Sequence, residues 1–145
     1  MIALLQRVSQ ASVRVEGKMI AEIGAGLLVL TAVHRDDEEK DIHRLAERIL
    51  GYRVFPDTNG RMNLSLKDTG GALLLVPQFT LAADTNKGAR ASFTRAAAPD
   101  KACLYFDRLS DACRGQLDTV ACGRFGADMQ VSLVNEGPVT FWLES

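Results

Sequence analysis

The sequence is poor in the residues on which disulfide frameworks, metal sites and histidine-based catalysis depend. It has three cysteines and two histidines among 145 residues. Cys103, Cys113 and Cys122 are odd in number and form no C-x-x-C pair, which excludes a disulfide framework and a zinc ribbon. Because His34 and His43 both lie around one acidic stretch, we expect neither a histidine-based triad nor a multi-histidine metal site. We predict reduced thiols, no metal and no cofactor.

Long apolar runs and an excess of one charge are also absent. No apolar run reaches the ~18 residues of a membrane-spanning helix, and the start, MIALLQRV, lacks the basic region and cleavage site of a signal peptide. We therefore expect a mature cytoplasmic protein without membrane contact. With 17 basic and 18 acidic residues the net charge is −1, so a nucleic-acid contact has to be a local patch.

What the sequence does have is the composition of one globular domain. Hydrophobic residues make up 47% and charged residues 24%, which is ordinary globular usage. The length fits a single domain over residues 1–145. The sequence contains no repeat, linker or low-complexity segment, so we expect no internal domain boundary.

Alternating and continuous apolar patterns predict most of a β-sheet. Residues 2–8 form a short apolar strand, and Val13 and Val15 lead through a turn at Glu16-Gly17 into a second strand over 19–23. Residues 24–33 (GAGLLVLTAV) are almost entirely apolar, which favours a strand covered on both faces.

A second buried strand is predicted over residues 72–81 (ALLLVPQFTL), and Pro77 interrupts it. Because proline offers no N–H to a ladder, this strand should lie at an edge or be irregular from that point. The remaining predicted strands cover 52–55, 62–66, 120–126, 129–134 and 139–143, with turns at 57–60, 67–71 and 135–138.

Helical periodicity occurs in two places. The first helix buries one stripe, formed by Ile42, Leu45, Ala46, Ile49 and Leu50, and we expect Gly51 to take the left-handed position after it. Pro99 suits the first turn of the second helix, whose apolar face is Ala102, Tyr105, Phe106, Leu109 and Cys113. The segment 84–98, with Lys87, Arg90 and Arg95, is predicted to be a long exposed loop.

Interleaved strands and helices of this kind indicate an α/β fold. We predict one compact domain of mixed β-sheet, with about eight strands and two main helices.

Two glycine- and histidine-containing features have ordinary structural explanations. Gly24-x-Gly26 lacks the third glycine and the following helix of a dinucleotide loop, so a tight turn explains it. His43 has no second ligand at metal spacing and fits a surface helix.

Two other segments are candidates for chemistry. In Val76-Pro77-Gln78-Phe79-Thr80, a proline breaks a buried strand and can free nearby backbone N–H groups for a ligand. In Asn135-Glu136-Gly137-Pro138-Val139-Thr140, a Gly-Pro dipeptide lies between two apolar strands. Composition alone also allows a polar strand end and an ordinary turn.

These segments resemble the two signature motifs of the D-aminoacyl-tRNA deacylase family. The resemblance covers essentially the whole chain: MIALLQRVSQASVRVEG, IGAGLLVL, LGYRVF, MNLSL, QFTLAADT and FGADMQVSLVNEGPVTFWL. It implies the family's fold, hydrolysis of the ester of D-aminoacyl-tRNA, and a homodimer with its active site at the interface. There the Gly137-Pro138 segment of one subunit, with a cis peptide bond, reaches into the pocket of the other.

The chain departs from the family's usual pattern at three positions. It has Pro77 where the family usually has serine, Glu136 where it has aspartate, and Ala91 where it has proline. Pro77 excludes a serine nucleophile at that position. A proline there is similar to a related animal branch, whose Gly-Pro bond is thought to be trans, whereas Phe79 and the Val-Thr after the Gly-Pro side with the main family.

The resemblance also suggests a mechanism that needs no strong nucleophile. The expected catalytic residues are Gln78, Phe79 and Thr80, with backbone N–H groups of Phe79 and Thr80 as donors to the oxyanion. In the family the tRNA's own 2′-hydroxyl is thought to help activate water. The alternative, Thr80 as a covalent nucleophile, lacks an evident base.

The expected substrate-binding residues are Gly137, Pro138, Arg7, Asn135, Phe125 and Met129. The Gly137 and Pro138 carbonyls would crowd the space of an L side chain, so that L-aminoacyl-tRNA is rejected and glycyl-tRNA is accepted. Arg7 either clamps the Gly-Pro segment or is a surface charge at a strand end. Phe125 and Met129 resemble the family's adenine-pocket positions, and core packing explains both equally well.

Two functions from other classes compete with the deacylase. A non-catalytic RNA-binding module would need a basic tail or patch, and this chain, with a net charge of −1, has no such tail. A hydrolase of small D-amino-acid esters would act on esters that lack RNA.

Overall fold

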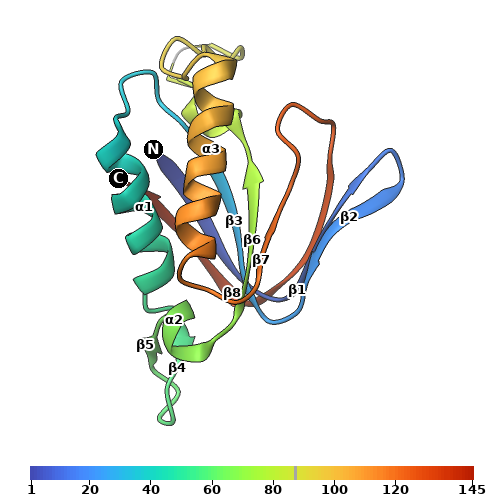
Figure 1. Cartoon of the computed structure of the whole chain (residues 1–145), viewed down its shortest axis with the longest axis vertical. Helices are drawn as coiled ribbons and strands as arrows, with labels where there is room; N and C mark the ends of the chain where they lie inside the picture. The colour runs from blue at the N-terminus through green and yellow to red at the C-terminus, as the bar shows by residue number, and fades with distance from the viewer. Residues whose placement is uncertain (87) are drawn as a thin grey trace.

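The computed structural model describes residues 1–86 and 88–145 and has the predicted mixed α/β architecture (Figure 1). Lys87, assigned above to the exposed loop, lies outside the described residues. The strands are β1 (Ile2–Val15), β2 (Lys18–Ile23), β3 (Gly26–Ala32), β4 (Phe55–Pro56), β5 (Met62–Leu64), β6 (Ala72–Pro77), β7 (Val120–Cys122) and β8 (Gln130–Glu144). The helices are α1 (Glu39–Gly51), α2 (Leu66–Thr69), the 3₁₀ helix η1 (Phe79–Ala82) and α3 (Pro99–Arg114).

Strand β1 organises the six-stranded sheet. On one side it pairs antiparallel with β8 along most of its length. On the other side its first half pairs with β3 and its second half with β2, both antiparallel. Parallel pairing then continues from β3 to β6 and from β6 to β7, whereas β4 and β5 form a separate two-stranded ribbon. The sheet is therefore mixed, as predicted.

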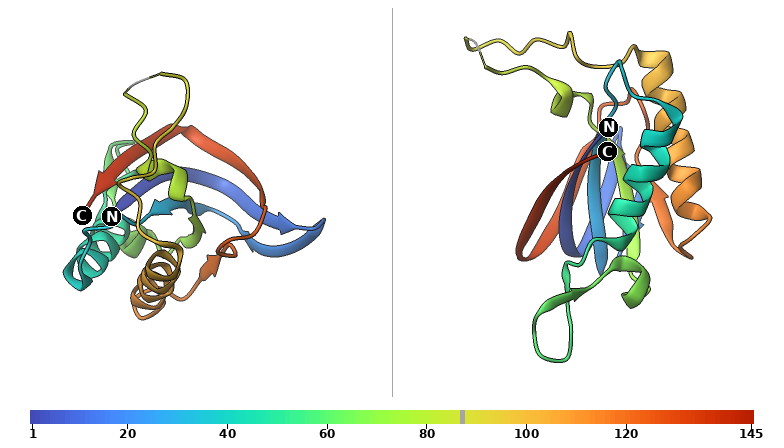
Figure 2. Two further views of the ribbon diagram at one scale, coloured as in Figure 1. Left: turned by 90° about the horizontal axis from the view of Figure 1, so that it is seen from above. Right: turned by 90° about the vertical axis from the view of Figure 1, so that its left-hand side faces the viewer.

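The sheet has a core on each face. Leu27, Val29, Leu73 and Leu75 point to the helices α1 and α3, which cover one face. Because successive strand residues point to opposite faces, Leu28 and Leu74 enter a second core with residues of β1 and β2. The sheet curls to close this second core, as the view from above shows (Figure 2). The prediction that residues 24–33 form a strand covered on both faces is thus confirmed.

Helix α1 buries the predicted stripe and begins at a reciprocal cap. The Asp41 carboxylate accepts a hydrogen bond from the Glu38 backbone N–H, at 2.8 Å. The expectation for Gly51 was wrong: the helix ends on Tyr52 in an extended conformation, and Gly51 is not in the left-handed region. The helix passes directly into an extended segment, which needs no left-handed residue.

Helix α3 begins at Pro99, as predicted, and its apolar face closes the core against α1 and the sheet. The loop before it is exposed at most of its described residues, also as predicted. Between the two helices, the predicted turn at 67–71 is instead the short helix α2, capped by the Ser65 side chain and ended by Gly70 in the left-handed conformation. The Ser-x-x-Asp pattern at Ser65 and Asp68 is a capping-box pattern, which indicates the start of a helix.

Several predicted strand boundaries were wrong. Residues 2–8 and the Val13 segment form one strand, β1, and three others are shorter than predicted, namely β4, β5 and β7. Residues 130–134 and 139–143 belong to one strand, β8, so the predicted turn at 135–138 is wrong. The register explains how the chain stays in the strand: Thr140 pairs with Gln6 and Asn135 with Val8, so residues 136–139 bulge out opposite Arg7.

Strand β6 ends at Pro77, where the sequence predicted an irregularity. The 3₁₀ helix η1 replaces the rest of the predicted strand. Of the two alternatives predicted for this strand, the structure has the irregularity and not the edge position, because β6 lies between β3 and β7. The proline is tolerated there because the ladder stops at it: the N–H of Gln78 donates the last hydrogen bond, to Thr31 O at 2.7 Å. Within the described residues, no helix is long and apolar enough to cross a membrane.

Candidate functional site

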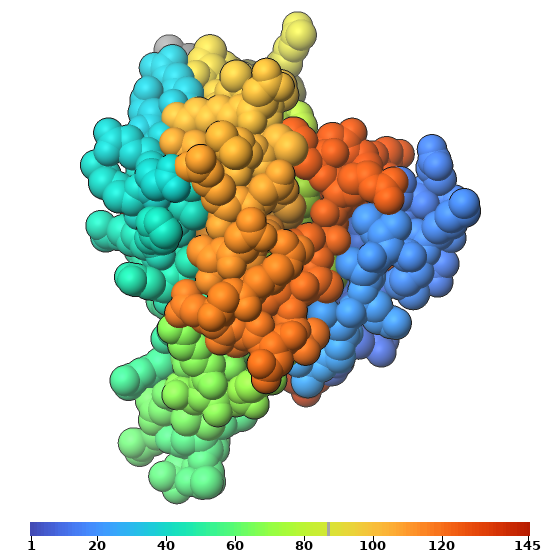
Figure 3. Space-filling view, viewed as in Figure 1, coloured from blue at the N-terminus to red at the C-terminus, as the bar shows by residue number. Residues whose placement is uncertain are grey.

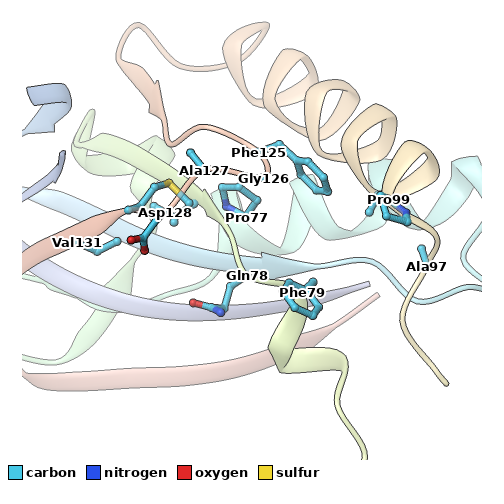
Figure 4. Close-up of a pocket in the computed structure, with 13 residues that line it drawn as sticks. Pro77, Gln78, Phe79, Ala97, Pro99, Phe125, Gly126, Ala127, Asp128 and Val131 are labelled. Atoms are coloured by element: carbon cyan, nitrogen blue, oxygen red, sulfur yellow. The ribbon is translucent and has the colours of Figure 1, made fainter. Parts of the chain in front are cut away.

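A cavity of about 560 Å³ opens where β6 ends (Figure 4). It brings together four of the predicted site residues, Gln78, Phe79, Phe125 and Met129. In Figure 4, Gln78 and Phe79 come from the end of β6, and Phe125 comes from the segment between β7 and β8. The remaining walls are mostly small or apolar, including Ala97, Pro99 and Ala102 at the start of α3. The cavity is suited to a flat apolar group with a polar edge.

The end of β6 offers backbone donors at the edge of this cavity. A 3₁₀ helix bonds each N–H to the carbonyl three residues earlier, and the first N–H groups have no partner inside the helix. In η1 that bonding begins with Leu81 N–H to Gln78 O at 3.2 Å, which leaves the N–H groups of Phe79 and Thr80 without intrahelical acceptors. The turn after Pro77 therefore presents two adjacent donors.

The side chains of Gln78 and Thr80 at this strand end hydrogen-bond to each other, and that of Phe79 is exposed and not buried in the core. The amide Nε2 of Gln78 donates a hydrogen bond to Thr80 Oγ1, which orders the segment. Phe79 is 56% exposed, and its ring contacts that of Phe93 with centroids 5.0 Å apart. Phe93, in the exposed loop, is a contact that the sequence patterns did not predict, because no periodicity links it to the strand.

The Gly137-Pro138 peptide bond is cis, as the family resemblance implied. Both residues are exposed at the tip of the β8 bulge. Gly137 has a φ of +150°, and a Cβ built there would lie 2.6 Å from Val139 Cγ2 and 2.9 Å from Val139 N. The bulge thus requires glycine at this position, because an L side chain would meet both its own backbone strain and the neighbouring main chain.

Arg7 holds this bulge from the opposite strand. Its Nε donates to Glu136 O at 2.8 Å and its Nη1 donates to Val54 O at 2.6 Å. The guanidinium therefore joins the β8 bulge to the segment after α1. Of the two readings of Arg7, the clamp of the Gly-Pro segment has the contacts it requires. The Val54 carbonyl is a partner that sequence reasoning missed, since nothing in the sequence distinguishes one backbone carbonyl from another.

Asn135 replaces the ladder bonds that the bulge loses. Its Oδ1 accepts from Val139 N–H at 2.7 Å, and its Nδ2 donates to Val139 O at 3.2 Å and to Thr140 Oγ1 at 3.0 Å. One amide side chain thus satisfies both backbone groups of Val139. Asn135 contacts the bulge, so in this structure it supports Gly137-Pro138 instead of lining the cavity.

The two motifs lie at opposite ends of the sheet within one chain. Arg7 pairs with Leu27 near the start of β3, whereas Thr31, near its end, pairs with Pro77. Thr31 lies four positions along β3 from Leu27, which corresponds to about 13 Å. Gly137, Pro138, Arg7 and Asn135 are accordingly not among the residues that line the cavity at Gln78 and Phe79.

Of the described residues that line the cavity, none is a serine, threonine, cysteine, lysine or histidine, and the one carboxylate is that of Asp128. Burial raises the pKa of the Cys113 thiol to about 12, so it stays protonated. No group of three or more His, Cys, Asp or Glu residues in the described part of the chain can hold a metal ion. The groups present for chemistry at the end of β6 are the backbone donors, the Gln78 amide and the Thr80 hydroxyl.

The comparison of sequences decides the family. The profile of the family described as "D-Tyr-tRNA(Tyr) deacylase" matches residues 4–144. The chain is 58% identical over 144 residues to the "D-aminoacyl-tRNA deacylase" of Escherichia coli O81 (strain ED1a), covering 99% of each chain. It belongs to the D-aminoacyl-tRNA deacylase family. The enzyme of that name from Shigella boydii serotype 18 is also 58% identical, again over 99% of both chains.

Solved structures support the fold of this deacylase family. One, described as "c-Myc DNA Unwinding Element Binding Protein", is 36% identical, with a TM-score of 0.96 over 100% of this chain and 99% of that one. Another, described as a "probable eukaryotic D-amino acid tRNA deacylase", is 20% identical, with a TM-score of 0.85 over 99% and 98% of the two chains. The second likeness bears on the fold alone.

Proposed function

We propose that this D-aminoacyl-tRNA deacylase places the scissile ester at the start of η1, beside the cavity described above. The enzyme is a hydrolase that cleaves the ester bond between a D-amino acid and the terminal adenosine of tRNA. The observation that carries this placement is the pair of backbone N–H groups, of Phe79 and Thr80, beside a cavity of about 560 Å³. One domain over residues 1–145, in the cytoplasm where aminoacyl-tRNA is made, carries the activity.

Backbone donors are sufficient for this ester because an aminoacyl ester is already reactive. When water attacks its carbonyl, negative charge develops on the carbonyl oxygen. A donor preorganised for that charge contributes about 2.7–4 kcal/mol in known oxyanion holes. The N–H groups of Phe79 and Thr80 donate hydrogen bonds to this oxygen, and Gln78 orders the segment that carries them. The 2′-hydroxyl of the tRNA assists the attacking water.

The cavity suits the terminal adenosine. Phe125 and Met129 form part of its wall and Phe79 stands at its mouth. Aromatic and thioether side chains pack well against a purine ring, and base–aromatic stacking contributes about 1–3 kcal/mol per base. The adenine-pocket reading of Phe125 and Met129 is favoured over pure core packing because both line open space.

The functional unit is a homodimer. The Gly137-Pro138 bulge and the Phe79 strand end lie too far apart in one chain to face one substrate. A two-fold axis that brings the bulge of one subunit to the strand end of the other does so twice, because such an interface is reciprocal. Exposed apolar side chains on β8, Val134 and Trp142, offer surface for such a contact.

The bulge provides the chiral selection. Arg7 and Asn135 hold Gly137 and Pro138 so that their carbonyls face the partner's cavity, in the space where an L side chain would project. Rejection by main chain does not depend on the side chain's identity. D-aminoacyl-tRNA is hydrolysed, glycyl-tRNA is also hydrolysed because glycine has no side chain, and L-aminoacyl-tRNA is spared.

Phe79→Pro tests the backbone mechanism. Proline is tolerated at the first position of a helix, and Gln78 can precede it because its backbone, at φ −143° and ψ 75°, lies outside the helical region that a following proline disfavours. The substitution removes one oxyanion donor, so kcat on D-aminoacyl-tRNA should fall by about 10²–10³. Phe79→Ala keeps the N–H and removes the ring, so it should chiefly raise KM. Equal kcat losses in the two variants, with matched melting temperatures, would contradict the proposed role of the N–H.

A further inference from the structure

A second cleft, of about 340 Å³, runs beside the first on the outer side of α3. It lies between α3 and the segment that continues from β7, both on the front face in Figure 3. Its polar lining comes from Asp107, Ser110 and Arg114 of α3 and from Cys122 and Arg124 of the facing segment. The deacylation mechanism above uses none of these residues.

The two clefts share a wall. Phe125 lines both of them. The residue before it, Arg124, lines the second cleft, and its backbone N–H donates to Met129 Sδ, at 3.3 Å, in the wall of the first. A strand whose terminal base lies against Phe125 and Met129 can continue into the second cleft, because Phe125 forms part of both walls. The shared wall therefore makes the next part of the same strand a candidate ligand of the second cleft.

The charge of the second cleft matches a phosphate. Arg114 and Arg124 contribute two positive charges and Asp107 one negative charge to the lining, while Asp111, outside the lining, pairs with Arg114. The Arg114 guanidinium is oriented by Asp111 Oδ1, at 3.1 Å from Nη1, and by Cys122 Sγ, at 3.2 Å from Nη2. A guanidinium has five N–H donors, so donors remain for phosphate oxygens. The ion pair between Arg114 and Asp111 is exposed, so it competes only weakly with a phosphate for the guanidinium.

We propose that this cleft binds the phosphodiester backbone of the single-stranded 3′ end of tRNA, next to the adenosine in the first cavity. Arg114 and Arg124 are the phosphate-binding residues. The inference rests on the proposed placement of adenosine against Phe125. Because the whole chain has a net charge of −1, this local pair of arginines supplies the attraction for tRNA that the overall charge does not.

Deacylation of two substrates separates this proposal from the catalytic one. Arg114→Gln with Arg124→Gln should raise KM for D-aminoacyl-tRNA about tenfold with little change in kcat, since each contact between an exposed arginine and a phosphate contributes about threefold to fivefold. The same variant should act like wild type on D-aminoacyl-adenosine, which carries no phosphate. Arg44→Gln, on the exposed side of α1, is the matched control and should change neither substrate.

Salt dependence and an opposite substitution complete the test. The slope of log kcat/KM against log salt should become shallower by about 0.7 for each arginine removed, as expected for single strands. Asp107→Asn removes the opposing charge and should lower KM for the tRNA substrate. An unchanged tRNA KM and slope in the arginine variant and in Asp107→Asn would overturn the phosphate cleft. Failure of wild type to release D-amino acid from either substrate would instead overturn the proposed function.

Discussion

The Gly137-Pro138 bulge and the strand end at Phe79 treat their backbone polar groups in opposite ways. In the bulge, side chains satisfy the main chain: Arg7 bonds the Glu136 carbonyl and Asn135 bonds both groups of Val139. At the strand end, Pro77 stops the ladder and the N–H groups of Phe79 and Thr80 have no intrahelical acceptor. The first arrangement fixes a shape and the second leaves donors free for a ligand. Side-chain substitutions should therefore be costly at the bulge and mild at the strand end.

Among the substitutions that keep the N–H groups of the strand end, the largest effect is expected from Gly137→Ala. The added methyl group would lie 2.9 Å from Val139 N and 3.2 Å from Arg7 Nη2, at a φ that L residues rarely adopt. The bulge has to move, and we expect kcat/KM for D-aminoacyl-tRNA to fall by at least about 100-fold, since small misplacements of this kind are costly. The melting temperature should change little because the bulge is exposed. Deacylation assays beside melting curves would measure both. If the variant turns over D-aminoacyl-tRNA at the wild-type rate, the bulge does not take part in the active site.

Arg7→Ala should have the next largest effect. It removes two charge-assisted hydrogen bonds, to Glu136 O and Val54 O, and so frees the bulge from the segment after α1. We expect an unfolding free energy lower by about 1–3 kcal/mol and a smaller ratio of D- to L-aminoacyl-tRNA hydrolysis. Matched D-, L- and glycyl-tRNA substrates report this ratio. If the ratio is unchanged while stability falls, Arg7 is a structural residue only.

Thr80→Ala should have the smallest effect. The substitution keeps the Thr80 N–H and removes the hydroxyl that accepts a hydrogen bond from Gln78. We expect kcat to fall by no more than about threefold, because one exposed neutral hydrogen bond is lost. A single-turnover assay with bound substrate separates chemistry from binding. Loss of the chemical step to background, with binding intact, would favour the hydroxyl as nucleophile and contradict the backbone mechanism.

Sequence patterns were reliable where an element is buried and unreliable where the chain changes direction. The stripe from Ile42 to Leu50 predicted α1 because burial of one face imposes a helical period, and the continuous apolar run at Leu27–Val29 predicted β3 because both of its faces are buried. The bulge in β8 was predicted as a turn, since Asn-Glu-Gly-Pro is turn-like in composition. Pairing of its two flanks with β1, Thr140 with Gln6 and Asn135 with Val8, keeps it in the strand, and Arg7 adds a side-chain hydrogen bond to Glu136 O across 129 positions.

The candidate site was found through the family resemblance more than through local chemistry. Gln78, Phe79 and Thr80 are not unusual residue types. Their proposed role depends on how the backbone N–H groups are oriented after Pro77, and local propensity does not encode that orientation. The Val54 carbonyl and the contact between Phe79 and Phe93 depend on tertiary packing and have no sequence signal.

A complementation assay tests most directly whether the strand end of one subunit works with the bulge of its partner. Phe79→Pro and Gly137→Ala would be purified separately, mixed in equal amounts and allowed to exchange subunits, then assayed on D-aminoacyl-tRNA. Each mixed dimer has one site with both defects and one with neither, so activity should return to about a quarter of wild type. If each site belongs to a single subunit, every site in the mixture carries one defect. The mixture would then stay as inactive as the two variants alone, which would contradict the account.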